Sequence, residues 1–540
     1  MRQISIFTLF LLLMAGAAIS QVNEEWVKKY ISPNNYDVSP CALTTDNIGN
    51  VYVLGSNGNL TTTYKNFVTL KYNPSGILLW TALYDGDGSP GYGANALAVD
   101  NDGNVYVTGS IIGTNFDYAT VKYNSSGVRQ WVAKYNGLAN NVDVSRDIKL
   151  DNNGNIYITG YSTGINDKVD YVTIKYNAAG IQQWLARYNS ENNLEDFGVS
   201  LLLDNSGNVF VGGYSSLDAA YTDYSIVKYD SLGIQQWATR YSCPAWNSID
   251  IPKTMIMDNN GNIYITGTSN GAGTDNDIVT IKYNSAGIEK WIQRYNGPGN
   301  LYDIPGSIAL DSHGNIYLAG ETHQIPQYTD LTIIKYDSLG NQIWLANYNG
   351  DAHEYGAAYS MIVDDSDNVI ITGYTDTGNN SDCITIKYSA LGELLWIKKY
   401  TGIGFNNAGI KIKQDQSKNI YIAGRIRDAS KLNMVTIKYS QVSGINILSN
   451  NLPSEFNLYQ NYPNPFNPTT KIKFDIPKLS DVKIIVFDAV GREIKNITQN
   501  NLTPGSYEYE FNGENLSSGI YYFKLQTNDF SKSVKMVLLK

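Results

Sequence analysis

One unit of sequence recurs eight times along this chain, and that repeat limits the possible folds more than any other feature. A Trp marks each unit, with spacings of 54, 51, 53, 53, 54, 53 and 52 residues. A Lys-Tyr pair and an Asn that opens an apolar segment each recur eight times as well. The Trp positions are Trp26, Trp80, Trp131, Trp184, Trp237, Trp291, Trp344 and Trp396. A chain of this kind builds its fold from copies of one supersecondary unit.

Each unit contains four short β-rich segments separated by turn residues. In one copy they are "IALD" (308–311), "NIYLAG" (315–320), "LTIIKY" (331–336) and "IWLANY" (343–348). The turns D-x-x-G-N and Y-N-x-x-G between them are rich in residues that fold back on their own backbone. A solenoid can share such a period, but four strands per unit favour the radial closure of a β-propeller.

The order of the landmarks predicts how the ring closes. Trp26 precedes the first complete set of three strands, and no Trp follows the last Lys-Tyr pair at Lys438-Tyr439. The segment "EEWVKKY" (24–30) therefore supplies the outer strand that the eighth blade lacks. Closure of this kind also removes an exposed strand edge, which is a site of aggregation.

The repeated motifs D-x-x-G-N-[IV]-[YF]-[IV] and [IV]-K-Y-[ND]-x-x-G-[IV]-x-x-W resemble bacterial β-propeller repeats of the SBBP type. NHL and quinoprotein propellers are more loosely similar. The resemblance covers residues 22 to about 440. It implies an eight-bladed β-propeller and says little about activity, because propellers support unrelated functions.

The N-terminus and the composition indicate an exported protein. Residues 1–20 combine Arg2, an apolar core and the small-residue site Ala18-Ile19-Ser20, as a cleaved transport signal does. No later segment is long and apolar enough for a membrane span. The net charge of −10 argues against nucleic acid as a partner. We interpret Cys41, Cys243 and Cys383 as unpaired packing residues, because their number is odd and each lies in a different unit.

Enzyme, cofactor and metal motifs occur only in contexts that do not support them. "GYSTG" (160–164) matches the serine-hydrolase pattern but is not followed by a helix. The vicinal Cys pair of quinone dehydrogenases is absent, and His313, His323 and His353 lack metal-ligand spacing. The D-x-x-G-N turns lack the later bidentate Glu of a calcium loop. We therefore expect no catalytic residue, no cofactor and no metal.

Four aspartates form a less easily explained pattern. Each precedes the turn aspartate of its unit by eight residues, and each is followed by an apolar residue; they are Asp143, Asp196, Asp250 and Asp303. One interpretation is a side-chain hydrogen bond that begins the inner strand, with pairing to Lys134, Arg187, Arg240 or Arg294. The other is an acidic arc around one mouth of the central channel.

The long loops between units and after each second strand emerge on one face, and binding residues concentrate on such loops. Aromatic residues stand there beside acidic and amide groups, a combination suited to sugar rings or peptides. The candidates for this ligand face are Tyr92, Phe197, Trp246, Tyr302, Tyr355 and Phe405, together with the four aspartates.

After residues 21–442, which we assign to the propeller, a polar stretch at 443–452 reads as a linker and residues 453–540 as a small immunoglobulin-like β-sandwich. This tail resembles the type A sorting domain of the type IX secretion system of Bacteroidota. The matching residues are Tyr462, Pro463, Asn464, Pro465, Phe466, Asn467, Gly519, Ile520 and Tyr521, with the "VFDAVGREI" stretch (486–494). The resemblance implies delivery to the cell surface or medium and a partner in the secretion machinery.

Three functions remain open from the sequence. The first is a monomeric, non-enzymatic binding module for an extracellular glycan or protein. The second is an extracellular polysaccharide lyase or hydrolase that uses the four aspartates at the mouth of the central channel. The third is a structural surface protein. Equivalent acids repeated around a ring are poor candidates for matched catalytic roles, so we favour the first.

Overall fold

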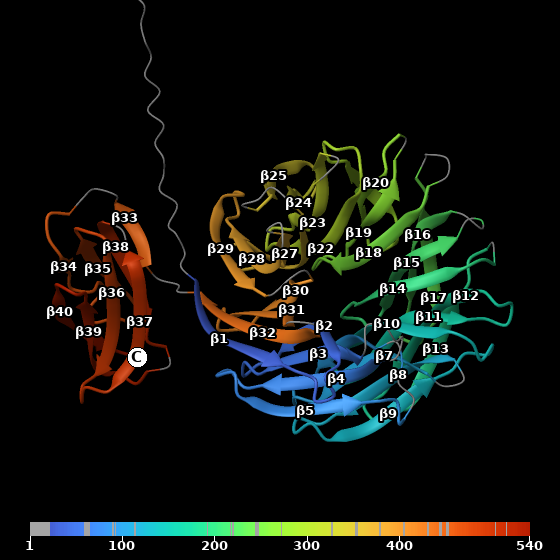
Figure 1. The fold of residues 1–540 in the computed structure, drawn as a ribbon, viewed down its shortest axis with the longest axis horizontal. Helices are drawn as coiled ribbons and strands as arrows, with labels where there is room; N and C mark the ends of the chain where they lie inside the picture. The colour runs from blue at the N-terminus through green and yellow to red at the C-terminus, as the bar shows by residue number, and fades with distance from the viewer. Residues whose placement is uncertain are drawn as a thin grey trace, which may run out of the picture. The chain divides into compact units, whose positions relative to one another are not determined.

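The computed structural model describes an all-β protein. It covers residues 22–540 except for 59–64, 89–90, 92, 113–114, 192, 217, 219–220, 244–247, 272, 326–327, 351–354, 377–379, 403–405, 429–430, 442–444, 450–452, 503 and 515. Every regular element in the described part is a strand (Figure 1). No helix there is long and apolar enough to cross a membrane. The expected transport signal, residues 1–20, lies outside the described part.

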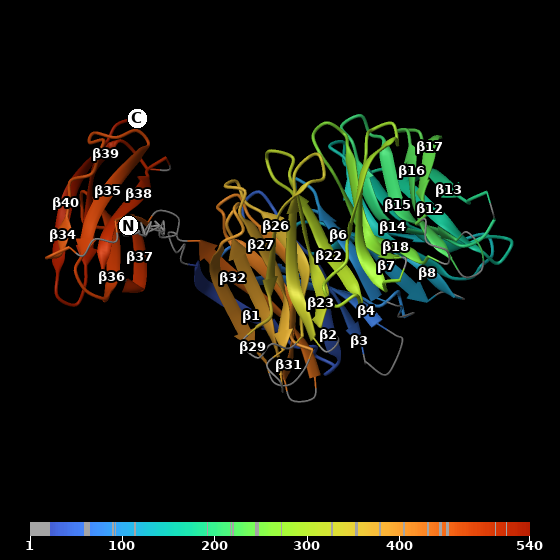
Figure 2. The same cartoon turned by 90° about the horizontal axis from the view of Figure 1, so that it is seen from above.

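The chain divides into a unit of Glu24–Ser440 and a unit that contains Gln441–Lys540. The first unit holds eight four-stranded antiparallel sheets arranged around a common centre (Figure 1). In Figure 2 the strands of these sheets run from one face of the unit to the other. Each first strand contacts the first strands of both neighbouring sheets, and β30 contacts β2, so the ring is closed.

The first, inner strands are β2 (Asp37–Thr45), β6 (Gly93–Val99), β10 (Asp143–Leu150), β14 (Asp196–Leu203), β18 (Asp250–Met257), β22 (Asp303–Leu310), β26 (Gly356–Val363) and β30 (Ala408–Gln414). The second strands are β3 (Val51–Gly58), β7 (Val105–Ile112), β11 (Ile156–Thr163), β15 (Val209–Ser216), β19 (Ile263–Asn270), β23 (Ile316–Ile325), β27 (Val369–Asp376) and β31 (Ile420–Asp428).

The third strands are β4 (Lys65–Tyr72), β8 (Phe116–Tyr123), β12 (Val169–Tyr176), β16 (Thr222–Tyr229), β20 (Asn276–Tyr283), β24 (Tyr328–Tyr336), β28 (Ser381–Tyr388) and β32 (Lys431–Gln441). The outer strands are β5 (Leu78–Tyr84), β9 (Arg129–Tyr135), β13 (Gln182–Tyr188), β17 (Gln235–Tyr241), β21 (Glu289–Tyr295), β25 (Gln342–Tyr348), β29 (Leu394–Thr401) and β1 (Val22–Tyr30). Thus β1, the first strand of the chain, completes the sheet of β30, β31 and β32.

In five of the eight sheets, the repeated Trp and Lys join the sheet to the next one through one backbone carbonyl. Trp80 Nε1 and Lys71 Nζ both donate to Ser125 O, each at 3.1 Å. Gly127 makes this possible, because its φ is +82° and a Cβ there would lie 2.7 Å from the Trp80 ring. We call this pair of hydrogen bonds the Trp latch. It also closes the ring, where Trp26 Nε1 and Lys438 Nζ donate to Pro74 O at 3.1 and 2.9 Å.

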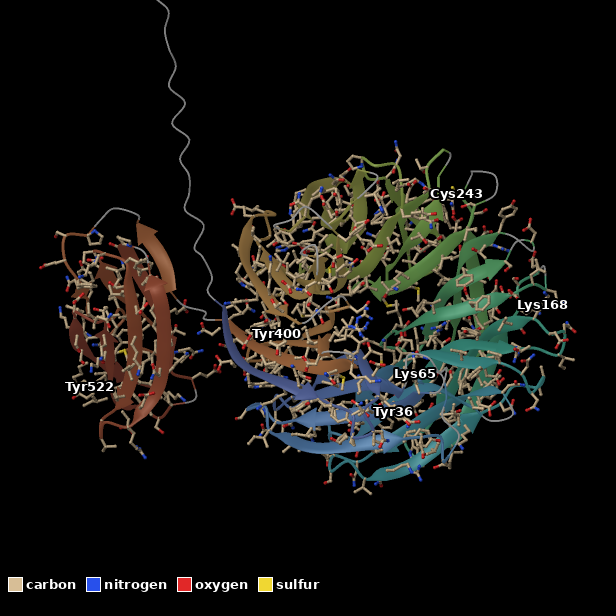
Figure 3. The ribbon with its side chains drawn as sticks, in the orientation of Figure 1. Tyr36, Lys65, Lys168, Cys243, Tyr400 and Tyr522 are labelled. Carbon is tan, nitrogen blue, oxygen red and sulfur yellow. The ribbon has the colours of Figure 1, made fainter. Side chains whose placement is uncertain are left out.

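Apolar side chains fill the spaces between sheets (Figure 3). Between the first two sheets, Leu54 and Phe67 form one buried cluster with Val105 and Val107. Burial of side chains of this size contributes roughly 1.5–3 kcal/mol each and holds neighbouring blades together. The cysteines are unpaired, as expected: Cys41 is partly buried, and Cys243 and Cys383 are buried.

The tail unit consists of two four-stranded sheets, ordered β33-β38-β35-β34 and β37-β36-β39-β40. Its strands are β33 (Ile445–Ser449), β34 (Asn457–Leu458), β35 (Thr469–Ile476), β36 (Ser480–Asp488), β37 (Glu493–Leu502), β38 (Gly505–Asn512), β39 (Gly519–Gln526) and β40 (Ser531–Leu538). Both sheets contribute to a single apolar core that includes Phe474, Val486, Tyr509 and Phe523.

The interpretation of residues 443–452 as a linker is wrong in part. Ile445–Ser449 forms β33, which pairs with β38 through Ile445↔Tyr509 and Ile447↔Tyr507. The alternation of Ile445 and Ile447 is a strand pattern, but it is too short and too closely surrounded by Asn and Ser to stand out. The tail therefore takes its first strand from the stretch that composition assigned to the linker.

Candidate functional site

The turns between first and second strands use their aspartate to organise their own backbone. Asp151 Oδ1 accepts from the backbone N–H groups of Asn153 and Asn155, both at 2.9 Å. Its Oδ2 accepts from Asn155 Nδ2 at 2.7 Å and from the Tyr157 hydroxyl at 3.1 Å. Such hydrogen bonds to the charged form lower the pKa of Asp151 against the opposing effect of burial. The hydrogen bonds of this carboxylate therefore stabilise the turn.

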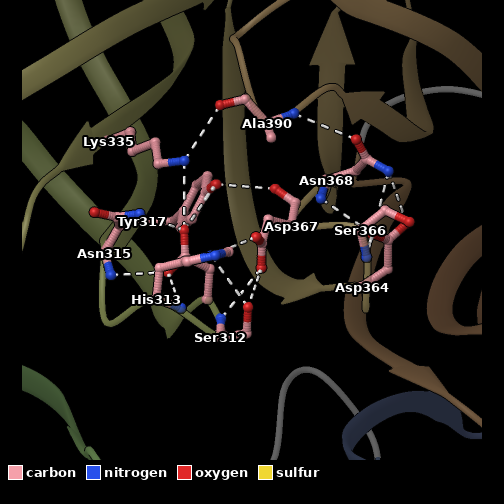
Figure 4. A network of polar contacts seen from close by, with 11 residues as sticks. Ser312, His313, Asn315, Tyr317, Lys335, Asp364, Ser366, Asp367, Asn368 and Ala390 are labelled. Atoms are coloured by element: carbon pink, nitrogen blue, oxygen red, sulfur yellow. Dashed lines mark hydrogen bonds and ion pairs between the residues drawn. The ribbon is translucent and has the colours of Figure 1, made fainter.

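One pair of these turns brings together a group that could hold a metal ion. Ligand atoms of Asp311, His313 and Asp367 lie within 4.8 Å of one another. The Asp311 carboxylate already accepts from Asn315 and Tyr317, and Asp367 accepts from the Ser312 N–H and hydroxyl, both at 3.1 Å (Figure 4). His313 Nδ1 lies 2.8 Å from Asp367 Oδ2. These contacts join the sixth and seventh sheets, and Asp367 has a positive φ because it stands at the Gly position of the D-x-x-G-N turn.

The four predicted aspartates are the first residues of their inner strands and are fully buried, so they do not form an exposed acidic arc. Asp196 Oδ2 accepts from Ser190 N–H at 2.7 Å, and Asp250 Oδ2 accepts from Cys243 N–H at 2.9 Å. Asp143 and Asp303 accept from Gly137 and Gly297 N–H in the same way, each at 2.5 Å. The structural interpretation is therefore correct.

The expected cationic partners lie elsewhere. Arg187, Arg240 and Arg294 pair with the third-strand residues Asp170, Asp223 and Asp277, at 2.8, 2.6 and 2.8 Å. Lys134 pairs with Asp87 at 3.4 Å. Spacing along one strand could not show that an acidic residue on the neighbouring strand lies closer to each arginine, or that a loop of the preceding sheet brings Asp87 to Lys134.

Three of the six predicted aromatic residues can be placed. Phe197 is partly buried between Tyr161 and Tyr214, with ring centroids 4.9 and 4.8 Å away. Tyr302 and Tyr355 are 49% and 45% exposed and stand beside His323 and Tyr328. Tyr92, Trp246 and Phe405 lie outside the described residues.

A cavity of about 390 Å³ opens among the inner strands of the fifth to eighth sheets. Its charged lining residues are Lys253 on β18, Glu321 on β23, Lys411 on β30 and Arg425 on β31. Apolar walls come from Ile304, Pro305, Ala357, Ala358 and Ile410, and Tyr359 adds a ring. None of the charged residues that line this cavity was predicted as a site residue from the sequence.

The cavity lies at the level of a β-bulge that every inner strand carries. The pairing of each first strand with its second strand skips one residue. The skipped residues in the fifth to eighth sheets are Lys253, Gly306, Tyr359 and Ile410, and all four line the cavity. Bulges re-aim side chains and often border functional sites. The residue at this position differs from sheet to sheet, so the repeat does not dictate it.

The electrostatics of the cavity differ from those of the whole protein. Lys411 is exposed, yet desolvation by the surrounding protein lowers the pKa of its ammonium, and the nearby Lys253 lowers it further against the opposing Cys41 and Asp147. Burial raises the pKa of the Glu321 carboxyl, while His323 and Lys253 oppose this effect. Three cations thus face one carboxylate inside a protein whose net charge is −10.

The tail residues of the predicted sorting motif divide into exposed and buried sets. Tyr462 is 82% exposed, whereas Phe466 and Tyr521 are buried in or beside the apolar core. Phe466 also pairs with β40, accepting from Leu539 N–H at 3.0 Å and donating to Val537 O at 2.9 Å. Pro463, Asn464, Pro465, Asn467 and Ile520 are exposed, and Gly519 is partly exposed.

Family comparisons agree with this division of the chain. Residues 86–117, 130–167, 236–273 and 290–324 match the β-propeller repeat family SBBP. Residues 460–539 match the secretion system C-terminal sorting domain. The chain therefore carries SBBP β-propeller repeats and a C-terminal sorting domain. Its sorting domain directs export through the type IX system to the cell surface or extracellular space.

Individual relatives are distant. An uncharacterized WD repeat-containing protein of Acanthamoeba polyphaga mimivirus is 23% identical over 497 residues, which is 74% of this chain and 33% of that protein. The chain thus spans about a third of the length of that curated relative.

Among solved structures, PorZ is a surface component of the type IX secretion system of Porphyromonas gingivalis. It is 12% identical, with coverage of 93% of this chain and 75% of that chain and a TM-score of 0.32. An ulvan lyase is 13% identical, with coverage of 62% and 90% and a TM-score of 0.40. Similarity at this level does not transfer an activity.

Proposed function

We propose that the protein is an exported binding module that captures an extracellular glycan or protein on the face where the long loops emerge. The observation that carries this proposal is the contrast between that face and the turn face. The turn aspartates are occupied by hydrogen bonds within their own turns, whereas Tyr302 and Tyr355 stand exposed at the other end of the sheets. Exposed aromatic side chains beside polar groups are typical anchors of binding sites.

A binding screen of the purified full chain against a glycan array and a panel of extracellular proteins tests the proposal. Tyr302→Ala, Tyr355→Ala and Trp246→Ala should weaken binding of the ligand found, by about 1–3 kcal/mol for each true anchor. Asn152→Ala on the turn face is the matched control and should leave affinity unchanged. Loss of binding in the folded control, with binding retained in the Tyr variants, would assign the wrong face.

A second candidate is an extracellular lyase or hydrolase whose reacting groups are side chains of the cavity rather than the four aspartates at the start of the inner strands. The burial of Asp143, Asp196, Asp250 and Asp303 removes the acids first considered for this role. A carboxyl with a raised pKa, Glu321, instead shares a cavity with an ammonium whose pKa is lowered, Lys411. Groups shifted in this way are candidate general acids and bases. Release of reducing ends or unsaturated sugars from acidic polysaccharides, lost in Glu321→Gln, tests this candidate.

Delivery by the tail can be tested with a boundary that the structure sharpens. Because β33 belongs to the tail sheets, a deletion should begin at Gln441 rather than at residue 453. We expect that truncated chain to remain in the periplasm of a host with type IX secretion. Fusion of Gln441–Lys540 to another exported protein should carry it to the surface or medium. Normal surface delivery of the truncated chain would contradict this role.

A further inference from the structure

The cations of the cavity have no partner that would explain their presence. Within the described residues, neither Lys253 nor Lys411 makes a hydrogen bond or an ion pair, and Glu321 makes none either. Arg425 donates from Nε to Asn406 O at 3.1 Å, which leaves its two terminal nitrogens to face other groups. Lys253 and Lys411 are exposed, so each is available to a ligand that carries a negative charge.

Beyond their first residues, the inner strands carry more cations than carboxylates. They carry Arg146, Lys149, Lys253, Lys411 and Lys413. Their acidic residues, apart from Asp147, are the buried ones that begin the strands: Asp37, Asp143, Asp196, Asp250 and Asp303. Asp147 is itself occupied, because its carboxylate accepts from Leu201 N–H at 2.9 Å and from Lys149 Nζ at 3.1 Å. Beyond the buried aspartates that begin the strands, the channel wall therefore presents five cations and one occupied carboxylate to a ligand.

One bulge position on the cavity wall lacks a side chain, which lets two neighbouring inner strands approach closely. Gly306 occupies the position held by Lys253 and Tyr359 in the neighbouring sheets on either side. A Cβ at Gly306 would lie 1.9 Å from Ala358 O, so no larger residue fits. The cavity volume of about 390 Å³ lies within the range of small-ligand sites.

The walls select among anionic ligands. The ring of Tyr359 and the flanking Ala357 and Ala358 form an apolar wall suited to the C–H face of a sugar, and Glu321 can accept hydrogen bonds from hydroxyl groups. An added peptide strand is disfavoured, because the bulge in every inner strand interrupts the regular row of backbone groups that strand addition needs.

We propose that this cavity binds a carboxylated sugar residue of an acidic glycan, with Lys253, Lys411 and Arg425 on its carboxylate and Glu321 on its hydroxyl groups. The assignment rests on the proposed binding function and names the ligand class. Charge-assisted hydrogen bonds to a carboxylate supply affinity, and the bidentate geometry of Arg425 supplies orientation.

Calorimetric titration of the full chain with a short oligogalacturonate and with its methyl ester tests the assignment. The ester keeps the ring and loses the charge, so it should bind at least about tenfold more weakly. Lys253→Gln combined with Lys411→Gln should weaken oligogalacturonate binding by a similar factor. Lys290→Gln is the matched control, because it removes an exposed cation from the outer strand of the sheet that carries Lys253, and it should change affinity less than about twofold.

Equal binding of the acid and the ester, or equal binding by the double variant, would overturn the proposal. Oligoglutamate that binds more tightly than oligogalacturonate, and that loses affinity in the double variant, would replace the sugar by an acidic peptide. Failure of the folded chain to bind oligogalacturonate would also overturn it. A different ligand that depends on Tyr302 and Tyr355 but not on Lys253 and Lys411 would leave the binding function standing and remove only this inference.

Discussion

Charged groups have different partners at the two ends of each sheet. We call the end where the inner strand finishes the turn end, and the end where it begins the mouth end. At the turn end, Asp151 and its equivalents accept the same hydrogen bonds in sheet after sheet, as Asp100 and Asp258 show. At the mouth end and in the channel, the partners change between sheets. Asp170 pairs with Arg187, for example, whereas Asp117 in the preceding sheet has no Arg partner in the described structure.

This difference separates residues that stabilise the shared fold of every sheet from residues that occur in single sheets and vary the surface. Identical groups in every copy stabilise the shared unit, and their energies recur around the ring. The side chains of Lys253 and Lys411 depart from the repeat and make no hydrogen bond or ion pair with the rest of the described ring. Their positions are the ones where selection for a ligand can act.

The largest expected effect on stability comes from removing the strand that closes the ring. Deletion of residues 22–31 removes β1, the Trp26 latch and the outer edge of the last sheet. We expect the free energy of unfolding to fall by about 4 kcal/mol or more, since a whole packed strand is lost. Urea unfolding followed by tryptophan fluorescence measures this. Glu24→Ala, which alters an exposed side chain of the same strand, should change stability by less than about 0.5 kcal/mol. A loss of stability in Glu24→Ala as large as that of the deletion would contradict the role of the Trp26 latch.

Removal of a turn aspartate should have the next largest effect. Asp151→Ala leaves Asn155 and Tyr157 without their acceptor, and we expect a loss of about 2–3 kcal/mol. Asp151→Asn retains one acceptor oxygen and should lose less. The two variants are compared by their denaturation midpoints, and equal losses would mean that the carboxylate charge rather than its hydrogen bonds matters.

The mouth end should respond to pH. Burial, with a contribution from Asp143, raises the pKa of Asp117 to about 6. Because this folded-state pKa exceeds the unfolded value of about 3.9, the stabilisation linked to its proton is complete below about pH 4 and is lost as pH rises through about 6. Asp117→Asn should therefore stabilise the protein by about 1–2 kcal/mol at pH 8 and have little effect at pH 4.

Asp170→Asn provides the contrast in the next sheet. It leaves the half-buried Arg187 without its carboxylate, so it should lower the unfolding temperature at pH 8. Thermal melts of both variants across this pH range decide the comparison. The same sign for both substitutions at pH 8 would show that the missing arginine does not distinguish the two sheets.

The smallest effect is expected in the channel. Lys411→Met removes a cation that Lys253 repels and keeps the length of the side chain. We expect a stabilisation of no more than about 1 kcal/mol, because solvent screens a group that is partly exposed. A clear loss of stability would mean that Lys411 supports the fold rather than a ligand.

Much of the fold could be predicted because its signals are local. The Asp151 turn depends on contacts within six residues, so the letters D-x-x-G-N predict both the turn and the occupied carboxylate. The candidate site was predicted less well. Asp143 and its equivalents were correctly singled out by spacing, but their burial depends on packing between sheets. The β33 strand was missed because its partner, β38, lies about 60 residues away in sequence.

The sequence by itself determined the repeated unit, the turns, the Trp latch residues and the sorting tail, because each depends on residues close together or on a motif repeated in register. Only the tertiary structure decided which charges meet. Lys253, Glu321, Lys411 and Arg425 come from four different strands, and ring closure brings them around one cavity. The bulge that turns Lys253 and Tyr359 toward that cavity arises where each inner strand pairs with its neighbour. Strand pairing and closure act over distances that no local pattern records, so the site emerges only when the ring is complete.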